Sequence, residues 1–257
     1  MRRPDWPLLA ERAAALLYPR RCPFCGTVLG PDVLQGNLCP DCRKEESRLA
    51  HEPPRLPGTE HTFYALSGAL AAYYYSGAVR EAILLCKRGG RPWYARELAD
   101  CMAVRIWGAV PAQRPGERPA NELFRAMPLY HCIVPVPPHQ TWAGVPGLPL
   151  LLARRLGILF QIPVVQGLRT ARGTTQQKAL TRAERAQNAR RAYTARPGLD
   201  LGGKRVLLVD DVITTGATVS ACALALLGAG AVDVTAAAVA VSEELPKEKR
   251  PFREKEQ

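Results

Sequence analysis

One stretch of sequence, residues 205–228, constrains the fold of this chain more than any other. It opens with an apolar run, Val206 to Val209, of the kind found in strands that are buried on both faces of a parallel sheet. Two acids and a small polar loop follow, and from Ala217 an apolar helix pattern runs to Gly228. This order of strand, loop and helix predicts an α/β unit in which helices pack against a parallel sheet.

The loop of this unit has the composition of an anion site. Its residues are small or carry hydroxyls: Thr214, Thr215, Gly216, Ala217 and Thr218. Unpaired N–H groups at a helix start, together with the positive end of the helix dipole, favour a phosphate. The preceding acids, Asp210 and Asp211, are suited to accept hydrogen bonds from sugar hydroxyls, or to face a cation or a developing positive charge. The structural alternative is an ordinary helix N-cap beside two solvated acids.

The segment 206–218, Val-Leu-Leu-Val-Asp-Asp-Val-Ile-Thr-Thr-Gly-Ala-Thr, resembles the phosphoribosyl-pyrophosphate (PRPP) signature of type I phosphoribosyltransferases. A Walker-type loop is excluded because Gly-Lys-Ser/Thr is absent, and a dinucleotide fingerprint is excluded by the single glycine. The chain also carries Cys22-Pro-Phe-Cys25 and Cys39-Pro-Asp-Cys42 near its start. The signature together with these cysteine pairs is most similar to the ComF-like competence family. The resemblance implies a doubly wound α/β domain that binds PRPP with Mg²⁺, with Asp210 and Asp211 as the catalytic residues and the loop 214–218 on the 5-phosphate.

Two C-x-x-C pairs near the start of the chain predict a zinc ribbon. They are Cys22-Pro-Phe-Cys25 and Cys39-Pro-Asp-Cys42, and four thiolates at this spacing can surround one Zn²⁺ as a tetrahedron. A site closed by four cysteines has no open position, so the metal should be structural. Disulfides are the competing interpretation. The other cysteines (Cys86, Cys101, Cys132 and Cys222) are scattered through apolar stretches, as buried thiols are in a reducing cytosol, so we expect a cytoplasmic protein.

Apolar runs and turn residues predict alternating strands and helices from the aromatic run 73–75 onward. Strands are expected there and at residues 132–137, 158–165, 206–209 and 232–241, and helices at 79–88, 94–110, 148–156 and 217–228. This alternation is typical of a doubly wound α/β domain, whose ligands lie at the carboxyl ends of the strands. We expect residues 1–50 to form an N-terminal helix and the ribbon, 51–58 a proline-rich linker, 60–242 the main domain, and 243–257 a disordered charged tail.

Basic residues elsewhere are candidates for PRPP binding. Lys87 lies in the last turn of a predicted helix, where it would either pair with the helix end or contact a ligand, and its block resembles the Tyr-…-Lys-x-x-Gly segment of ComF-like proteins. Arg172 and Lys178 lie in a basic segment, residues 169–196, whose first part reads as a mobile loop before a capping box at 181–184. Lys178, Arg182 and Arg185 have the i, i+4, i+7 spacing of one helix face. They form either an ordinary solvated face or a row of cations that closes over pyrophosphate.

Two functions remain open on these grounds. The first is an enzyme that transfers ribose 5-phosphate from Mg²⁺–PRPP to an unknown acceptor. The second is a non-catalytic PRPP-fold protein that assists uptake of single-stranded DNA in natural transformation, beside a competence helicase. The second is favoured because the Arg-Gly-Phe-Asn-Gln segment usual in ComF-like proteins is replaced by residues 145–149, Val-Pro-Gly-Leu-Pro. The net charge of +12 allows either kind of partner, a polyphosphorylated small molecule or nucleic acid. We expect no membrane span, and association between copies of the chain is left open.

Overall fold

The computed structural model describes residues 13, 17, 19–30, 33–34, 36–58, 61, 63–88, 90–109, 129–138, 146–171 and 192–242. Its centre is a four-stranded sheet of β1 (Gly68–Tyr74), β6 (Asp233–Val241), β5 (Arg205–Ile213) and β2 (Cys132–Pro135), in that order across the sheet. Every pair is parallel. β3 (Leu168–Thr170) and β4 (Tyr193–Ala195) form a separate antiparallel pair. The helices are α2 (Pro40–Leu49), α3 (Gly77–Arg88), α4 (Tyr94–Trp107), α6 (Leu148–Phe160) and α8 (Ala217–Gly228).

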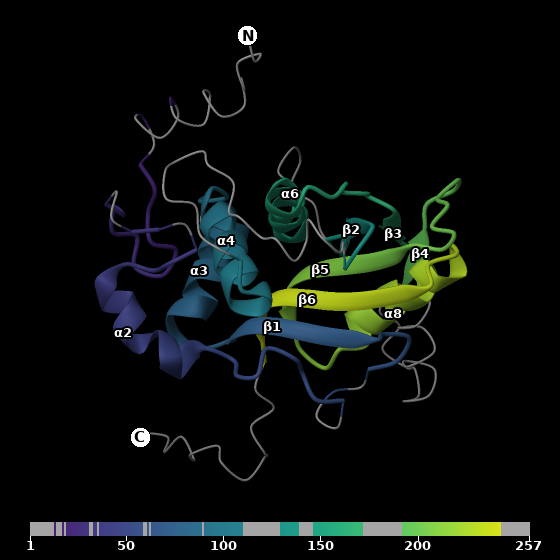
Figure 1. Cartoon of the computed structure of the whole chain (residues 1–257), viewed down its shortest axis with the longest axis horizontal. Coiled ribbons are helices and arrows are strands. Elements are labelled where there is room, and N and C mark those ends of the chain that lie inside the picture. Colours follow the sequence, from purple (N-terminus) through teal and green to yellow (C-terminus); the bar gives the residue numbers. More distant parts are fainter. Residues whose placement is uncertain are drawn as a thin grey trace, which may run out of the picture.

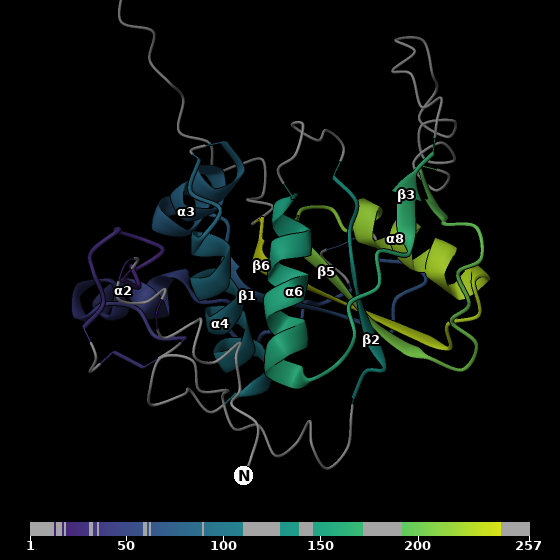
Figure 2. The same ribbon diagram turned by 90° about the horizontal axis from the view of Figure 1, so that it is seen from above.

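Helices cover both faces of this sheet, as the sequence predicts. Alternate residues of β5 divide between two cores, because successive side chains of a strand point to opposite faces. Leu207 and Val209 belong to the core that includes residues of α3, α4 and α6, whereas Val206 and Leu208 belong to the core that includes residues of α8. Figure 1 shows the layers, and Figure 2 shows α4 and α6 side by side across one face. The predicted doubly wound α/β fold with a parallel sheet is therefore confirmed.

The predicted strand at residues 158–165 does not form, and its first three residues belong to a helix instead. α6 continues to Phe160, and of the predicted strand 158–165 a single bridge remains, between Val164 and Ile133. Gly157 makes this possible, since a Cβ there would lie 2.7 Å from Cγ2 of Val164, and the chain can therefore turn back closely against the helix. A short apolar run fits helix and strand periodicity equally well, so the packing decided the outcome.

The N-terminal cysteine region packs directly on the main sheet and its helices. Phe24 meets Tyr73 of β1 edge to face, with ring centroids 5.4 Å apart. Arg20 makes two hydrogen bonds to the buried carboxylate of Glu97 on α4, of 2.9 and 2.8 Å. The predicted linker is also ordered: the Leu56 N–H donates to the carbonyl of Ala69, so this segment runs along the free edge of β1.

Two of the predicted segments lie outside the described residues. These are the charged tail, 243–257, and the N-terminal helix, of which Ala13 and Leu17 alone are described. Among the helices that the structure does describe, none has the length and apolar character needed to cross a membrane.

Candidate functional site

The two acids of the signature occupy the sixth and seventh positions of β5, whose nine residues end at Ile213. The alternation along the strand places Asp210 on the face covered by α8 and Asp211 on the face covered by α3. Both are almost fully buried. The pair therefore straddles the sheet near its carboxyl edge, so each acid can serve a different part of one ligand.

The pKa of the Asp210 carboxyl is raised to near neutrality. Burial first, and then repulsion from Asp211, raise its pKa to about 7, although the backbone N–H of Asp211 donates a 2.8 Å hydrogen bond to Oδ1 of Asp210. On the α8 side, Asp210 adds to the effect of burial in raising the pKa of the Cys222 thiol. A carboxyl that is half ionised near neutrality can accept or donate a proton at the sheet edge.

Asp211 is paired with a cation from a distant helix. Nζ of Lys87, near the end of α3, lies 2.7 Å from Oδ2 of Asp211. The Lys87 side chain is 40% exposed and that of Asp211 is 8% exposed, so the lysine side chain is partly open to solvent while the carboxylate is enclosed. The sequence identifies Lys87 as a candidate ligand, and the structure brings it to the signature acids.

The loop after β5 leads directly into α8. Gly216 precedes the helix with φ of +83°, a left-handed conformation that favours glycine. The hydroxyl of Thr215 accepts a 3.4 Å hydrogen bond from the N–H of Ala217. Thr214 and Thr215 are exposed, whereas Gly216 is buried. The loop thus presents hydroxyls and the first turn of a helix beside Asp210, as an anion site requires.

The end of β2 lies next to the acids. The Val136 N–H donates a 2.9 Å hydrogen bond to the carbonyl of Val209, so the residues after β2 continue beside Asp210 and Asp211. Residues 139–145 lie outside the described part of the chain. Beyond them, Pro146 and Gly147 lead straight into α6, which begins at Leu148.

Arg172 and Lys178 also lie outside the described residues, as does the capping box at 181–184. The flanks of that segment are described: Ala171 N–H donates to the carbonyl of Ala192 at 2.8 Å, next to the β3–β4 pair.

The β3–β4 pair, which the sequence does not predict, brings Tyr193 to the site. Its side chain hydrogen-bonds with Thr218, and burial, followed by Cys222 and Asp210, raises its pKa. A strand of only three residues, Tyr-Thr-Ala, is too short to show the alternating pattern by which a strand is recognised in a sequence.

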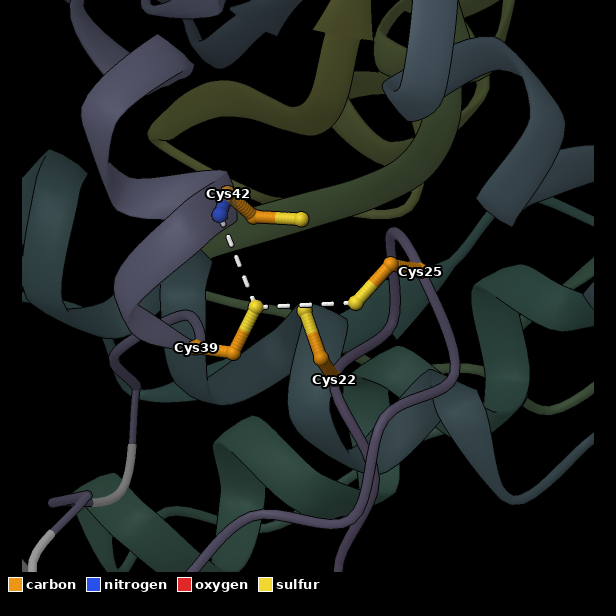
Figure 3. Close-up of side chains that lie close together, drawn as sticks. All are labelled: Cys22, Cys25, Cys39 and Cys42. Carbon is orange, nitrogen blue, oxygen red and sulfur yellow. Dashed lines mark hydrogen bonds between the residues drawn. The ribbon is translucent and has the colours of Figure 1, made fainter.

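The four predicted metal ligands form one cluster (Figure 3). All four sulfurs lie within 4.8 Å of one another, and Sγ of Cys25 is 3.5 Å from Sγ of Cys39. With zinc–sulfur bonds of about 2.3 Å, the sulfurs of a tetrahedral site are about 3.8 Å apart. The structure pairs none of its eight cysteines in a disulfide. The residues therefore fit one zinc ion and are compatible with the predicted ribbon.

Two thiols of this cluster, Cys22 and Cys25, have pKa values shifted in opposite directions. Burial opposes ionisation of Cys25, but its hydrogen bonds with the side chain and the backbone of Thr27 lower its pKa to about 7. Burial raises the pKa of Cys22. The backbone N–H of Cys42 donates to Sγ of Cys39 across the start of α2. Donors aimed at sulfur stabilise thiolates, the form that binds a metal.

Comparison with known proteins gives one family and several solved structures. The family model described as phosphoribosyl transferase domain matches residues 147–255. No curated protein matches the chain. Among solved structures, the glutamine PRPP amidotransferase from B. subtilis, complexed with ADP and GMP, is 27% identical with a TM-score of 0.31, over 44% of this chain and 23% of that chain. This chain spans less than a quarter of the length of the first two matched structures.

Two smaller phosphoribosyltransferases are matched over more of their length. The purine phosphoribosyltransferase from Pyrococcus horikoshii Ot3 is 20% identical, with a TM-score of 0.34, over 63% of this chain and 95% of that one. The adenine phosphoribosyl transferase from Trypanosoma brucei is 18% identical, with a TM-score of 0.34, over 88% and 92%. The parallel sheet, the acid pair before a helix start, and the family match over residues 147–255 together support a type I phosphoribosyltransferase-like domain in the second half of this chain.

Proposed function

We propose that residues 60–242 bind PRPP with Mg²⁺ and transfer its ribose 5-phosphate to an acceptor. The observation that carries the proposal is the arrangement of Asp210, Asp211 and the loop 214–218 at one sheet edge, within the region matched by the family model. In the reaction, the bond from ribose C1 to pyrophosphate breaks, and its electron pair leaves on the pyrophosphate. The acceptor then supplies the electron pair for the new bond to C1.

The phosphate of the ribose would bind at the loop. Thr214 and Thr215 are exposed there, and Thr218 lies in the first turn of α8 beside Tyr193. Hydroxyls and helix N–H groups are suited to hold a phosphate dianion. Asp210, on the same face of the sheet, would accept hydrogen bonds from the ribose hydroxyls. Its carboxylate would also stabilise the positive charge that develops on the sugar ring.

The opposite face of the sheet edge would receive the leaving group. Lys87, whose side chain is partly exposed, holds its ammonium group there against Asp211. A cation at this point would attract pyrophosphate, and Asp211 fixes the lysine where it is needed. Arg172 and Lys178 are proposed to add positive charge from the segment between β3 and β4. When bound with PRPP, Mg²⁺ would neutralise charge on the leaving pyrophosphate.

Zinc is proposed to hold the N-terminal ribbon together. Cys22, Cys25, Cys39 and Cys42 supply a closed set of four sulfurs, so the metal has a structural role. The ribbon in turn packs on β1 and α4 through Phe24 and Arg20. Loss of the metal should therefore disturb packing beyond the ribbon itself.

The second candidate function is ligand binding without turnover, in a competence protein that assists uptake of single-stranded DNA beside a helicase. It is favoured by residues 146–149, which carry no basic or amide side chain and serve to start α6. A pyrophosphate-release assay with PRPP, Mg²⁺ and a panel of nucleobases and amines separates the two functions. Release above that of an Asp210→Ala, Asp211→Ala double variant supports the transferase. Binding of PRPP without release supports the binding protein.

A further inference from the structure

An aromatic side chain from outside the signature covers its central glycine. Phe63, in the segment that precedes β1, packs against Gly216: a Cβ added at Gly216 would lie 2.4 Å from Cε1 and 2.5 Å from Cδ1 of the Phe63 ring. Such distances are far below van der Waals contact, so the ring occupies the space that a side chain at position 216 would need. Gly216 is therefore required both by its φ of +83° and by this contact.

The segment that carries Phe63 is fastened to α8. The Tyr64 N–H donates a 3.1 Å hydrogen bond to Oγ of Ser220, which is fully buried in the first turns of that helix. The Ser220 N–H in turn donates to the carbonyl of Gly216 at 3.0 Å. The residue beside Phe63 is thus linked by two hydrogen bonds to the glycine that the ring covers.

A strained residue completes the attachment. Ala65 has φ of +60°, a conformation that residues with a Cβ rarely adopt, and such residues persist where the surrounding contacts fix them. On its far side the Ser67 N–H donates to the carbonyl of Val234 at 3.0 Å. Ala65 is therefore held between the α8 contact and the sheet, and the resulting turn directs Phe63 onto Gly216. His61 stacks on Phe63, with ring centroids 4.9 Å apart and 5° between planes.

We infer that Phe63 is a positioning residue of the phosphate loop: it fixes Gly216 in the conformation that directs the loop 214–218 and the start of α8 toward a ribose phosphate. This inference rests on the proposed function. Ordering a loop when the ligand binds costs free energy, and a loop that is already ordered avoids this cost. The contact between Phe63 and Gly216 therefore raises the affinity although Phe63 does not touch the ligand. It also makes the site depend on a segment outside the region 147–255 that the family model matches.

The test compares Phe63→Ala with Phe63→Leu and a remote control, Phe160→Leu. Phe160 is buried at the end of α6 against Trp107, in the core on the other face of the sheet. Two quantities are measured on the full chain: amide hydrogen exchange of residues 214–218 without ligand, and the affinity for ribose 5-phosphate by calorimetry. We expect Phe63→Ala to speed exchange in the loop and to weaken binding about tenfold. Phe63→Leu should recover most of both, and Phe160→Leu should lower the melting temperature while leaving both unchanged.

The two readouts separate this inference from the proposed function. Unchanged exchange and affinity in Phe63→Ala, or equal changes in Phe160→Leu, would overturn the role of Phe63. Faster loop exchange in Phe63→Ala, together with a wild-type protein that does not bind ribose 5-phosphate, would support the ordering contact and refute the proposed ligand. If Phe63→Ala does not fold, Phe63→Leu carries the test, with a smaller change of the same sign expected and no change overturning the inference.

Discussion

Asp210 should make the protein less stable as the pH rises, and Asp210→Asn should remove that effect. The pKa of Asp210 is about 7, compared with an ordinary value of 3.8, because the carboxyl is buried and lies next to Asp211. A raised pKa means that the folded protein holds this proton more tightly than the unfolded chain. Stability is therefore lost as the pH rises from about 4 to about 7, and the loss is complete above that window.

The size of the effect follows from the difference between the two pKa values. About three pKa units at 1.36 kcal/mol each give an upper limit of about 4 kcal/mol for the cost of ionising Asp210 in the folded protein. Asparagine keeps an oxygen that can accept the hydrogen bond from the Asp211 N–H and carries no charge. We therefore expect Asp210→Asn to stabilise the protein by roughly 2–4 kcal/mol at pH 8, and by little at pH 4.

Urea unfolding at a series of pH values measures this difference directly. The control is Asp41→Asn, whose side chain is 91% exposed and should show no gain in stability at pH 8. The same variant of Asp210 should weaken ribose 5-phosphate binding, since a carboxylate suited to the ribose would be lost. A stability difference that is independent of pH, or a destabilised Asp210→Asn at pH 8, would refute the account of Asp210 as a buried and reluctantly ionised group.

Three further predictions concern the metal, the ligand and nucleic acid. Purified protein should contain about one zinc per chain by metal analysis, and Cys39→Ser should lose both the metal and the fold of residues 20–45; absence of zinc, or disulfides in non-reducing mass spectrometry, would contradict this. The double variant Asp210→Ala, Asp211→Ala should bind PRPP at least about tenfold more weakly by calorimetry while remaining folded by circular dichroism, at roughly 1.5–3 kcal/mol per charge-assisted hydrogen bond; equal binding would mean that the motif is scaffold. Single-stranded DNA should bind weakly, with little sequence preference and an affinity that falls steeply with salt in a fluorescence titration, and a flat salt response would remove DNA as a partner.

The sequence alone predicts those parts of the fold that depend on residues close together along the chain. The apolar run, acids, small loop and apolar helix of residues 205–228 predict a strand, a loop and a helix in that order because each element has its own period and its own terminating residues. β5 is longer than the predicted strand 206–209, since it continues through both acids to Ile213. The spacing of the two C-x-x-C pairs likewise predicts the cysteine cluster, since Cys22 and Cys25 flank a tight turn and Cys39 and Cys42 lie at the first turn of α2. Local periodicity misled at residues 158–160, where an apolar run suits either element and packing beside Gly157 extended the helix.

The composition of the site was decided by tertiary structure. Strand alternation and the helices on each face separate Asp210 from Asp211, although the two are neighbours in sequence. The parallel order β1-β6-β5-β2 brings Lys87 to Asp211, and the chain before β1 brings Phe63 to Gly216. The position of β4 does the same for Tyr193 and Thr218. These contacts join residues far apart along the chain, and they arise because two faces of one sheet must be covered at once, a condition that no local pattern of residues records.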